Sequence, residues 1–177
     1  DGSGEVTVKK CGDCGGSGRI ESTEGLKVRI PKGVATGQKL KLRGKGNDAR
    51  VHGDPGDLFV IINVSDHVLF QRRGSDLFCT VPIRFSDAAL GTAVEVPTLG
   101  GKTTIKVPTG TDSGRVLRLA GRGLPTMKGS RNGDLHISLE VETPQDLDKA
   151  QIDTLKTLNK CLGDEAYPKR RAFADNM

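Results

Sequence analysis

The sequence predicts a mainly β protein, in which two tandem homologous domains, each an all-β barrel or sandwich, are followed by a short C-terminal helix. Glycine supplies 24 of the 177 residues, which is typical of chains whose short strands are joined by many turns. Several segments alternate apolar and polar residues, which is the period of a strand. One such pattern occurs twice, and Pro31 of the first copy recurs 77 residues later as Pro108.

The duplicated segment aligns without a gap over 34 positions that begin at Pro31, and eleven of these positions are identical. The identities are Pro31, four glycines, two leucines, Val64 and a Gly-Asp-Leu triplet, which stands at 56–58 in the first copy and at 133–135 in the second. Chance similarity rarely keeps turn residues and core residues in one register. The simpler interpretation is two copies of one supersecondary unit.

Each copy is expected to contain three strands. Leu26, Val28 and Ile30 alternate with polar residues, and Pro31 ends this first strand because proline has no N–H for a ladder. A glycine-rich turn, a short second strand, a glycine-containing loop and a strictly alternating third strand follow. This density of strands and turns predicts an antiparallel barrel or sandwich. The predicted strands are 26–30, 40–42 and 58–64 in the first copy and 103–107, 117–119 and 135–141 in the second.

Residues 76–96, which precede the first strand of the second copy, are assigned to the second domain. Apolar residues alternate over 77–85, and this alternation predicts a strand. Residues 86–91 predict a short helical turn that ends at Gly91, and residues 92–96 predict another strand.

The last predicted element is an amphipathic helix. Asp148 is a suitable N-cap, and Gln151 three residues later completes a capping box. An apolar stripe at helical spacing follows over 152–162, and Gly163 is the expected stop. Residues 164–177 are expected to be a tail.

Two of the four cysteines, Cys11 and Cys14, form a CxxC pair. Two thiolates held by a glycine-rich turn suit zinc, but structural zinc takes four ligands and only these two stand together in the sequence. The pair also allows a thiol–disulfide oxidoreductase, although the βαβ pattern usual for such enzymes is missing. Cys79 and Cys161 stand alone in apolar periodic segments and are expected to be small buried hydrophobic residues.

Because the net charge is +5, a nucleic-acid-binding protein with a zinc knuckle is considered as an alternative. The lysines and arginines are scattered among apolar residues, which favours solvated strand faces, so nucleic acid is not an expected partner. No signal peptide and no apolar run of membrane-spanning length is recognisable, which favours a cytoplasmic protein without a membrane partner. Nucleophile-elbow, Walker and HExxH patterns are missing, so no enzyme is predicted and no catalytic residue is assigned.

The segment 11–18 has the form CxxCxGxG, and two homologous β-domains follow it. This combination resembles the class of DnaJ co-chaperones that carries a zinc finger, and the resemblance runs from Asp1 to about Phe173. It implies two β-domains with a zinc finger inserted into the first, a C-terminal dimerisation segment and a role in the heat-shock response. Further stretches that are similar to this family are 27–34, 53–60, 88–91, 94–99 and 131–135.

The resemblance also implies a function, namely that a co-chaperone fragment binds extended apolar segments of unfolded polypeptides for transfer to a DnaK-type chaperone. It implies zinc and a homodimer in the full-length protein. The His-Pro-Asp signature of a J-domain is missing, so this chain is not expected to stimulate a DnaK ATPase by itself. The predicted divisions are a finger remnant at 1–20, a first substrate-binding β-domain at 21–70, a second β-domain at 71–147, and a helix with a truncated dimerisation tail at 148–177.

Two expectations follow from departures from the family pattern. The chain has one CxxC of the finger's four and is expected to begin inside the finger. Because the family's last CxxC shares its zinc with the first, Cys11 and Cys14 are expected to hold no stable four-ligand zinc within one chain. Residues 171–173 resemble the start of the dimerisation segment, which ends four residues later, so weak or absent dimerisation is expected.

A surplus of apolar residues marks the third strand of the first copy. Phe59 and Ile61 stand on the face where the second copy has polar residues. Apolar surface beyond what a one-sided sheet needs is typical of a binding surface. Packing beneath a finger or neighbouring strands is the alternative explanation.

By resemblance, the substrate-peptide groove lies on this same first domain. Leu26 and Val60 match positions that line the pocket, and Val28 and Ile62 lie beside them. All four could equally be ordinary core residues, because they alternate with polar or outward-facing residues. The expected mechanism is strand addition, in which the client backbone pairs with a sheet edge and an apolar side chain enters the pocket.

Overall fold

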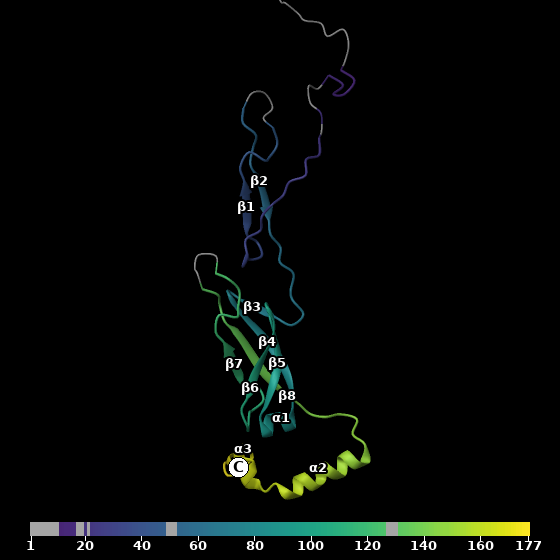
Figure 1. The fold of residues 1–177 in the computed structure, drawn as a ribbon, viewed down its shortest axis with the longest axis vertical. Helices are drawn as coiled ribbons and strands as arrows, with labels where there is room; N and C mark the ends of the chain where they lie inside the picture. The colour runs from purple at the N-terminus through teal and green to yellow at the C-terminus, as the bar shows by residue number, and fades with distance from the viewer. Residues whose placement is uncertain (1–10, 17–19, 21, 49–52, 127–130) are drawn as a thin grey trace, which may run out of the picture. The chain divides into compact units, whose positions relative to one another are not determined.

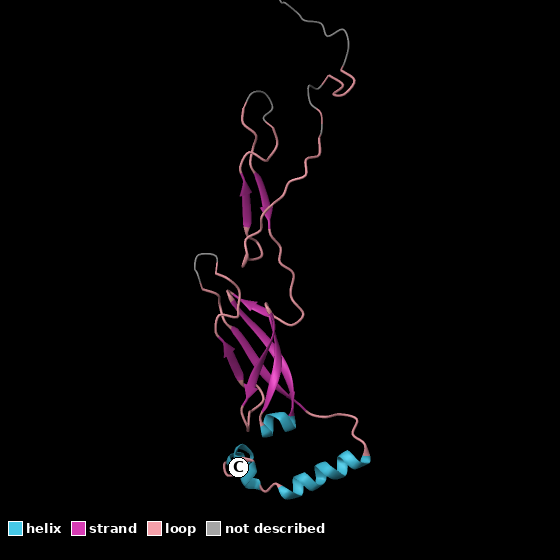
Figure 2. Cartoon of the chain, in the orientation of Figure 1, coloured by secondary structure: helices cyan, strands magenta, loops and turns pink. Residues whose placement is uncertain are grey.

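A computed structural model describes residues 11–16, 20, 22–48, 53–126 and 131–177 (Figure 1). Part of the predicted finger remnant, at positions 1–10 and 17–19, lies outside the described residues. The chain divides into two compact units, Asp1–Pro31 and Lys32–Met177. Strands dominate the described residues, their sheets are open, and the helices are few, which confirms the predicted mainly β fold class (Figure 2).

The first unit contains a turn but no helix or strand among its described residues. Residues 12–16 form the turn, in which the Gly15 N–H donates to the carbonyl oxygen of Cys11 at 2.8 Å. The strand predicted at 26–30 is not formed, so this prediction is wrong. A strand needs ladder partners for its N–H and C=O groups, and this segment has none among the described residues.

The first repeat, residues 32–64, folds as a two-stranded hairpin. Strand β1 (Lys39–Leu42) pairs antiparallel with β2 (Leu58–Ile61), and the two form a sheet of their own. Leu40 lies opposite Val60 in this ladder, so apolar side chains from both strands share one face.

The second repeat, residues 109–141, belongs to a larger β-structure, the second domain. The strand order of its main sheet is β3-β4-β8-β7, and β5 and β6 form a separate hairpin. Helix α1 (Phe85–Leu90) connects β4 to β5 and ends at Gly91, as predicted, with a Gly91 φ of 78°. The strands are β3 (Gln71–Arg73), β4 (Asp76–Arg84), β5 (Thr92–Thr98), β6 (Gly101–Val107), β7 (Val116–Leu119) and β8 (Leu135–Glu142).

The longest pairing of this sheet is parallel, which corrects the prediction of an antiparallel arrangement throughout. β4 runs alongside β8 from Leu77 opposite Leu135 to Arg84 opposite Glu142. Parallel neighbours need a long crossover connection, and the chain from α1 to β7 supplies it. Alternation in the sequence marks each strand, but it does not encode the direction of the neighbouring strand.

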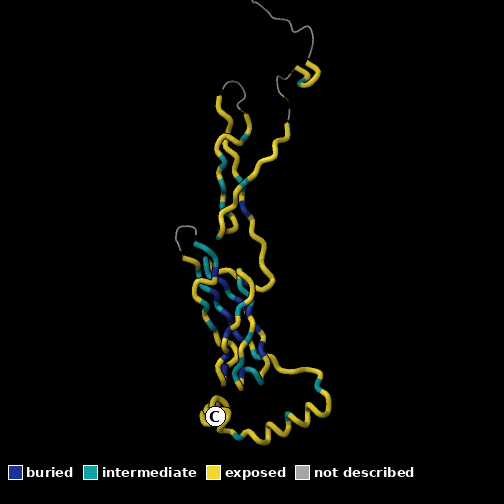
Figure 3. Tube along the Cα trace, viewed as in Figure 1, coloured by how far each residue is buried: buried dark blue, intermediate teal, exposed yellow. Residues whose placement is uncertain are grey.

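The main core is formed by the four-stranded sheet together with the β5–β6 hairpin (Figure 3). Leu135, Ile137 and Leu139 of β8 are completely buried, since residues two apart point to the same side of a strand. Cys79 is buried, as predicted, and desolvation raises the pKa of its thiol. The other buried residues contributed by strands are Leu77, Val81, Ile83, Val96, Ile105 and Val107.

Backbone hydrogen bonds that recur 77 residues apart confirm the duplication predicted from the sequence. In the first repeat, the Gly37 N–H donates to the carbonyl oxygen of Ile62 at 2.8 Å. In the second, the Gly114 N–H donates to the carbonyl oxygen of Leu139 at 2.7 Å. Identical residues in the two copies therefore build the same local backbone.

The aspartate of the Gly-Asp-Leu triplet closes the same loop in both repeats. Asp57 accepts a hydrogen bond from the Gly44 N–H at 3.0 Å, and Asp134 accepts one from the Gly121 N–H at 2.8 Å. Gly44 and Gly121 have φ values of 63° and 68°, in the left-handed region that favours glycine. The repeated glycine and aspartate are thus explained by one turn that each copy needs.

Helix α2 (Lys149–Cys161) begins at the predicted capping box. Asp148 accepts from the Gln151 N–H at 2.8 Å, and the Gln151 side chain accepts from the Asp148 N–H at 2.9 Å. No residue of α2 is buried. The predicted burial of Cys161 is therefore wrong, because the helix that carries it is not covered.

The segment predicted to be a tail is helical instead. A 3₁₀ turn, η1 (Asp164–Ala166), is followed by α3 (Pro168–Ala174). Pro168 stands in the first turn of α3, where its fixed φ favours a helix and its missing N–H leaves no bond unmade. No described helix combines the length and the apolar character that crossing a bilayer requires.

Candidate functional site

The four residues predicted to form the peptide groove belong to different units. Leu26 and Val28 lie in the first unit, where Leu26 is exposed and Val28 is half-buried. Val60 and Ile62 lie in the first repeat and point to the same face of the β2 segment. The structure brings Val60 and Ile62 together, and the grouping of all four residues stays a prediction.

The hairpin face that carries Val60 is apolar and only partly covered. Leu40 lies opposite Val60, and Leu42 lies opposite Leu58. Leu58 is 37% exposed, whereas its equivalent in the second repeat, Leu135, is completely buried. The face that is core in the second repeat is therefore accessible at Leu58 in the first, whereas Ile62 at the end of this face is buried.

The other face of the hairpin exposes apolar side chains beside cations. Phe59 and Ile61 are 56% and 65% exposed. The Lys41 ammonium lies 5.8 Å from the centroid of the Phe59 ring and 2.6 Å from the Asp57 carboxylate. Hydrogen bonds from Lys41 and from the Gly44 N–H lower the pKa of Asp57 below its ordinary value. This face combines apolar surface with an ion pair.

One edge of β2 has no partner strand among the described residues. The Ile62 N–H points toward the β1 side, because it donates to the carbonyl oxygen of Gln38 at 2.9 Å. Backbone groups alternate in direction along a strand, so those of Phe59, Ile61 and Asn63 point to the opposite side, called the open edge below. In the second repeat, β4 covers the equivalent edge of β8.

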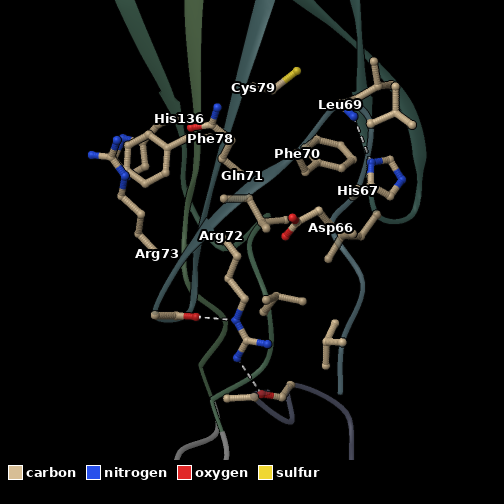
Figure 4. Close-up of a pocket in the computed structure, with 18 of the residues that line it drawn as sticks. Asp66, His67, Leu69, Phe70, Gln71, Arg72, Arg73, Phe78, Cys79 and His136 are labelled. Atoms are coloured by element: carbon tan, nitrogen blue, oxygen red, sulfur yellow. Dashed lines mark hydrogen bonds between the residues drawn. The ribbon is translucent and has the colours of Figure 1, made fainter. Parts of the chain in front are cut away.

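The segment after β2 lines a cleft between the first repeat and the second domain, called the junction cleft below (Figure 4). Its volume is about 1460 Å³. Phe70, Leu77 and Cys79 are buried residues of its lining, whereas Val64 and Leu69 are exposed. Reasoning from the sequence missed this cleft, because it placed only the boundary between the first β-domain (21–70) and the second (71–147) in this stretch. The apolar run at 68–70 is the signal that could have found it.

Arg72 bonds to both sides of the junction cleft (Figure 4). Its Nη1 donates to the carbonyl oxygen of Val34 at 2.6 Å, and its Nη2 donates to that of Gly33 at 2.7 Å. Its Nε donates to the carbonyl oxygen of Gly74 at 2.8 Å. The first two acceptors belong to the first repeat, and the third belongs to the β3–β4 turn of the second domain.

Cys11 and Cys14 do not complete a metal site with the other described residues. Cys11 is exposed and Cys14 is half-buried, both next to or within the turn at 12–16. The described ranges contain no group of three or more His, Cys, Asp or Glu side chains that could hold a metal ion. Structural zinc takes four ligands, so the described residues do not fit zinc.

The comparison with known families covers both repeats. A family model described as the DnaJ C terminal domain matches residues 4–144. This chain belongs to that family. The resemblance to DnaJ co-chaperones found in the sequence is therefore confirmed.

Individual DnaJ proteins align with almost the whole chain. Chaperone protein DnaJ of Acetivibrio thermocellus is 40% identical over 176 residues, which cover 99% of this chain and 46% of that protein. The DnaJ of Fusobacterium nucleatum subsp. polymorphum is 41% identical over 176 residues, 99% of this chain and 45% of that protein. The DnaJ of Opitutus terrae is 43% identical over 170 residues, 96% and 44% of the two chains. The chain thus spans about half the length of the curated relatives it matches.

Proposed function

We propose that this chain binds extended apolar segments of unfolded polypeptides and passes them to a DnaK-type chaperone. The first β-domain, at 21–70, carries the groove, and the second, at 71–147, supports it. The observation that carries the proposal is the open edge of β2, which lies next to an apolar face that is only partly covered. The chaperone names of the DnaJ relatives support the same assignment.

The proposed mechanism is strand addition. The client main chain pairs with the backbone groups of Phe59 and Ile61 on the open edge, which gives affinity with little sequence preference. Client side chains at alternate positions contact the apolar face. Burying one Leu-sized side chain contributes roughly 1.5–3 kcal/mol, so affinity for a short segment stays low enough for release. The proposed groove residues are Leu26, Val28, Val60 and Ile62.

The second repeat supports this mechanism, because it contains the same arrangement in a completed form. There, β4 covers the edge of β8 along eight paired positions. β4 is nine residues long, and its buried residues stand at every second position. It is an internal example of the kind of segment that we propose the open edge accepts.

The test is a titration of a nine-residue peptide with the alternation of β4, followed by fluorescence anisotropy. Val60→Asp is expected to weaken binding by about tenfold or more, because a carboxylate replaces an apolar contact. Leu90→Asp, which places the same charge at an exposed position of the second domain away from the junction cleft, is expected to leave binding unchanged. If a folded Leu90→Asp loses binding while a folded Val60→Asp keeps it, the site is on the second domain.

Further proposals concern the whole protein, of which this chain spans about half. We propose a cytoplasmic homodimer that contains zinc and has no membrane or nucleic-acid partner. The exposed Phe173 and the uncovered apolar stripe of α2 support dimerisation. Light scattering of this chain with and without residues 168–177 tests the interface. A tight dimer that survives the deletion would place the interface elsewhere.

A further inference from the structure

We infer that Arg72 is a positioning residue that holds the first repeat against the second domain, so that the open edge of β2 and the junction cleft form one continuous track for an extended polypeptide. The identity of the ligand rests on the proposed function. The geometry rests on the contacts of Arg72 and can be tested without any ligand.

The guanidinium of Arg72 joins two parts of the chain that are far apart in sequence. Its acceptors Gly33 and Val34 are 39 and 38 residues away, and Gly74 is two residues away. A guanidinium presents its N–H groups in a rigid planar fork, so bonds to two successive carbonyl oxygens fix direction as well as distance. A lysine at this position has a single ammonium and does not reproduce the fork.

A second contact at the same place is independent of the Arg72 side chain. Gly33 has a φ of 80°, and a Cβ at this position would overlap the carbonyl oxygen of Pro125. The loop of the first repeat therefore approaches the second domain so closely that only glycine fits. Arg72 acts on a loop that already lies against the second domain.

The connection after β2 makes the track continuous. Residues 64–70 follow the open edge directly, and all seven line the junction cleft. An extended client rises about 3.3 Å per residue, so one that is longer than the edge itself reaches the cleft. There it meets the apolar side chains of Val64 and Leu69 at the surface and Phe70 beneath them.

The adjacent Arg73 provides a matched control. Its guanidinium lies 4.6 Å from the centroid of the Phe78 ring, and both residues belong to the β3–β4 hairpin of the second domain. Removal of Arg73 deletes the same charge one residue away and leaves the bonds to Gly33 and Val34 in place.

Residual dipolar couplings measured by NMR test the geometry. One alignment tensor is expected to fit both the first repeat and the second domain in the wild type and in Arg73→Ala. Arg72→Ala and Arg72→Lys are expected to need two tensors. A single tensor in Arg72→Ala would overturn the inference. Loss of hydrogen-exchange protection at the Gly37 and Ile62 amides in Arg72→Ala would also overturn it. Such a loss would mean that Arg72 maintains the fold of the first repeat rather than its orientation.

Binding of peptides of two lengths tests the track. The probes have seven and fourteen residues, with Leu at alternate positions and neutral polar residues between. The longer peptide is expected to bind the wild type about tenfold more tightly than the shorter one. In Arg72→Ala the two peptides are expected to bind equally, with the affinity of the shorter one within about twofold of the wild type.

Two results would overturn the continuous track, namely no gain with length in the wild type, or the full gain in Arg72→Ala. If neither peptide binds the wild type, the proposed function fails, and the alignment tensors still decide whether Arg72 sets the geometry.

Discussion

The two repeats have the same hydrogen-bonded turns and the same pair of antiparallel strands, but they differ in the strands that lie beside this pair. β8 has β7 on one edge and β4 on the other, and its inward residues Leu135, Ile137 and Leu139 are completely buried. Among the strands that the structure describes, β2 has only β1 beside it, and the equivalent Leu58 stays 37% exposed. The same hydrogen-bonded turns therefore occur in a finished core and in an accessible hairpin. The different burial of Leu58 and Leu135 therefore follows from the neighbouring strands and not from the repeated sequence.

Aspartate at the equivalent positions 60 and 137 is expected to give the largest difference between the repeats in the free energy of unfolding. Ile137→Asp buries a carboxylate in the core and is expected to cost more than about 4 kcal/mol, which unfolds the second domain. Val60→Asp, in the half-buried equivalent, is expected to cost about 1 kcal/mol. Urea denaturation followed by circular dichroism measures both. Equal losses would show that the first repeat is as well covered as the second.

Proline at equivalent edge positions is expected to have the next largest effect. The Ser138 N–H points toward β4, because that of its neighbour Leu139 donates to Arg115 on the other side. Ser138→Pro is therefore expected to cost about 2–3 kcal/mol through a lost ladder bond and an unpaired acceptor. Ile61→Pro removes an N–H on the open edge and is expected to cost less than about 1 kcal/mol.

Urea denaturation measures this second pair of variants, and peptide titration completes the comparison. Ile61→Pro is expected to lose peptide binding while it stays folded, because the client strand loses one main-chain partner. Unchanged binding in this variant would argue against strand addition at the open edge.

Alanine at a repeated glycine compares the two repeats directly. The local steric clash is the same in both, but the part of the chain that it destabilises differs. A Cβ on Gly46 would lie 2.8 Å from the carbonyl carbon of Gly56, and one on Gly123 would lie 2.6 Å from that of Gly133. Each substitution is expected to cost about 1–2 kcal/mol. Gly123→Ala is expected to lower the free energy of global unfolding. Gly46→Ala is expected to lower only the free energy of local opening, measured by hydrogen exchange at the Ile62 amide. Global destabilisation by both would mean that the repeats unfold together.

The smallest expected effect is the pH dependence of the first-repeat turn. Lys41 and the Gly44 N–H lower the pKa of Asp57 below its ordinary value of 3.8. A lowered pKa gives stability that is fully present above the unfolded pKa and is lost as the pH falls through the folded pKa. The Gly44 amide signal is therefore expected to change below pH 3.8. Lys41→Met is expected to move this midpoint upward, and an unmoved midpoint would exclude Lys41 as the main cause.

Local signals in the sequence were sufficient for most of the fold. Alternation located β4 and β8, Gly91 ended α1, and Asp148 with Gln151 formed the capping box, because each depends on residues close together in the chain. The strand expected at 26–30 failed, since alternation shows that a segment can be a strand and not that a partner is present. The parallel pairing of β4 with β8 was missed for the same reason.

The candidate site was less predictable. Val60 and Ile62 could be placed on one face because the period of a strand requires it. Arg72 could not be found, because its partners are carbonyl oxygens, which every residue has, at separations of 38 and 39 residues. A side chain that binds distant backbone leaves no pattern in the sequence.

The parallel pairing of β4 with β8 also determines when the second domain can fold during synthesis. Arg84, the last residue of β4, faces Glu142, so 58 residues must be added after β4 before its partner strand is complete. At ribosomal rates of about 5–20 residues per second, this takes roughly 3–12 s. During this time β4 has only β3 to pair with, and its inward residues, which stand at every second position, lack the core that β8 completes. Each newly synthesised copy of this chain therefore passes through a state in which it has the features of the clients that we propose it binds.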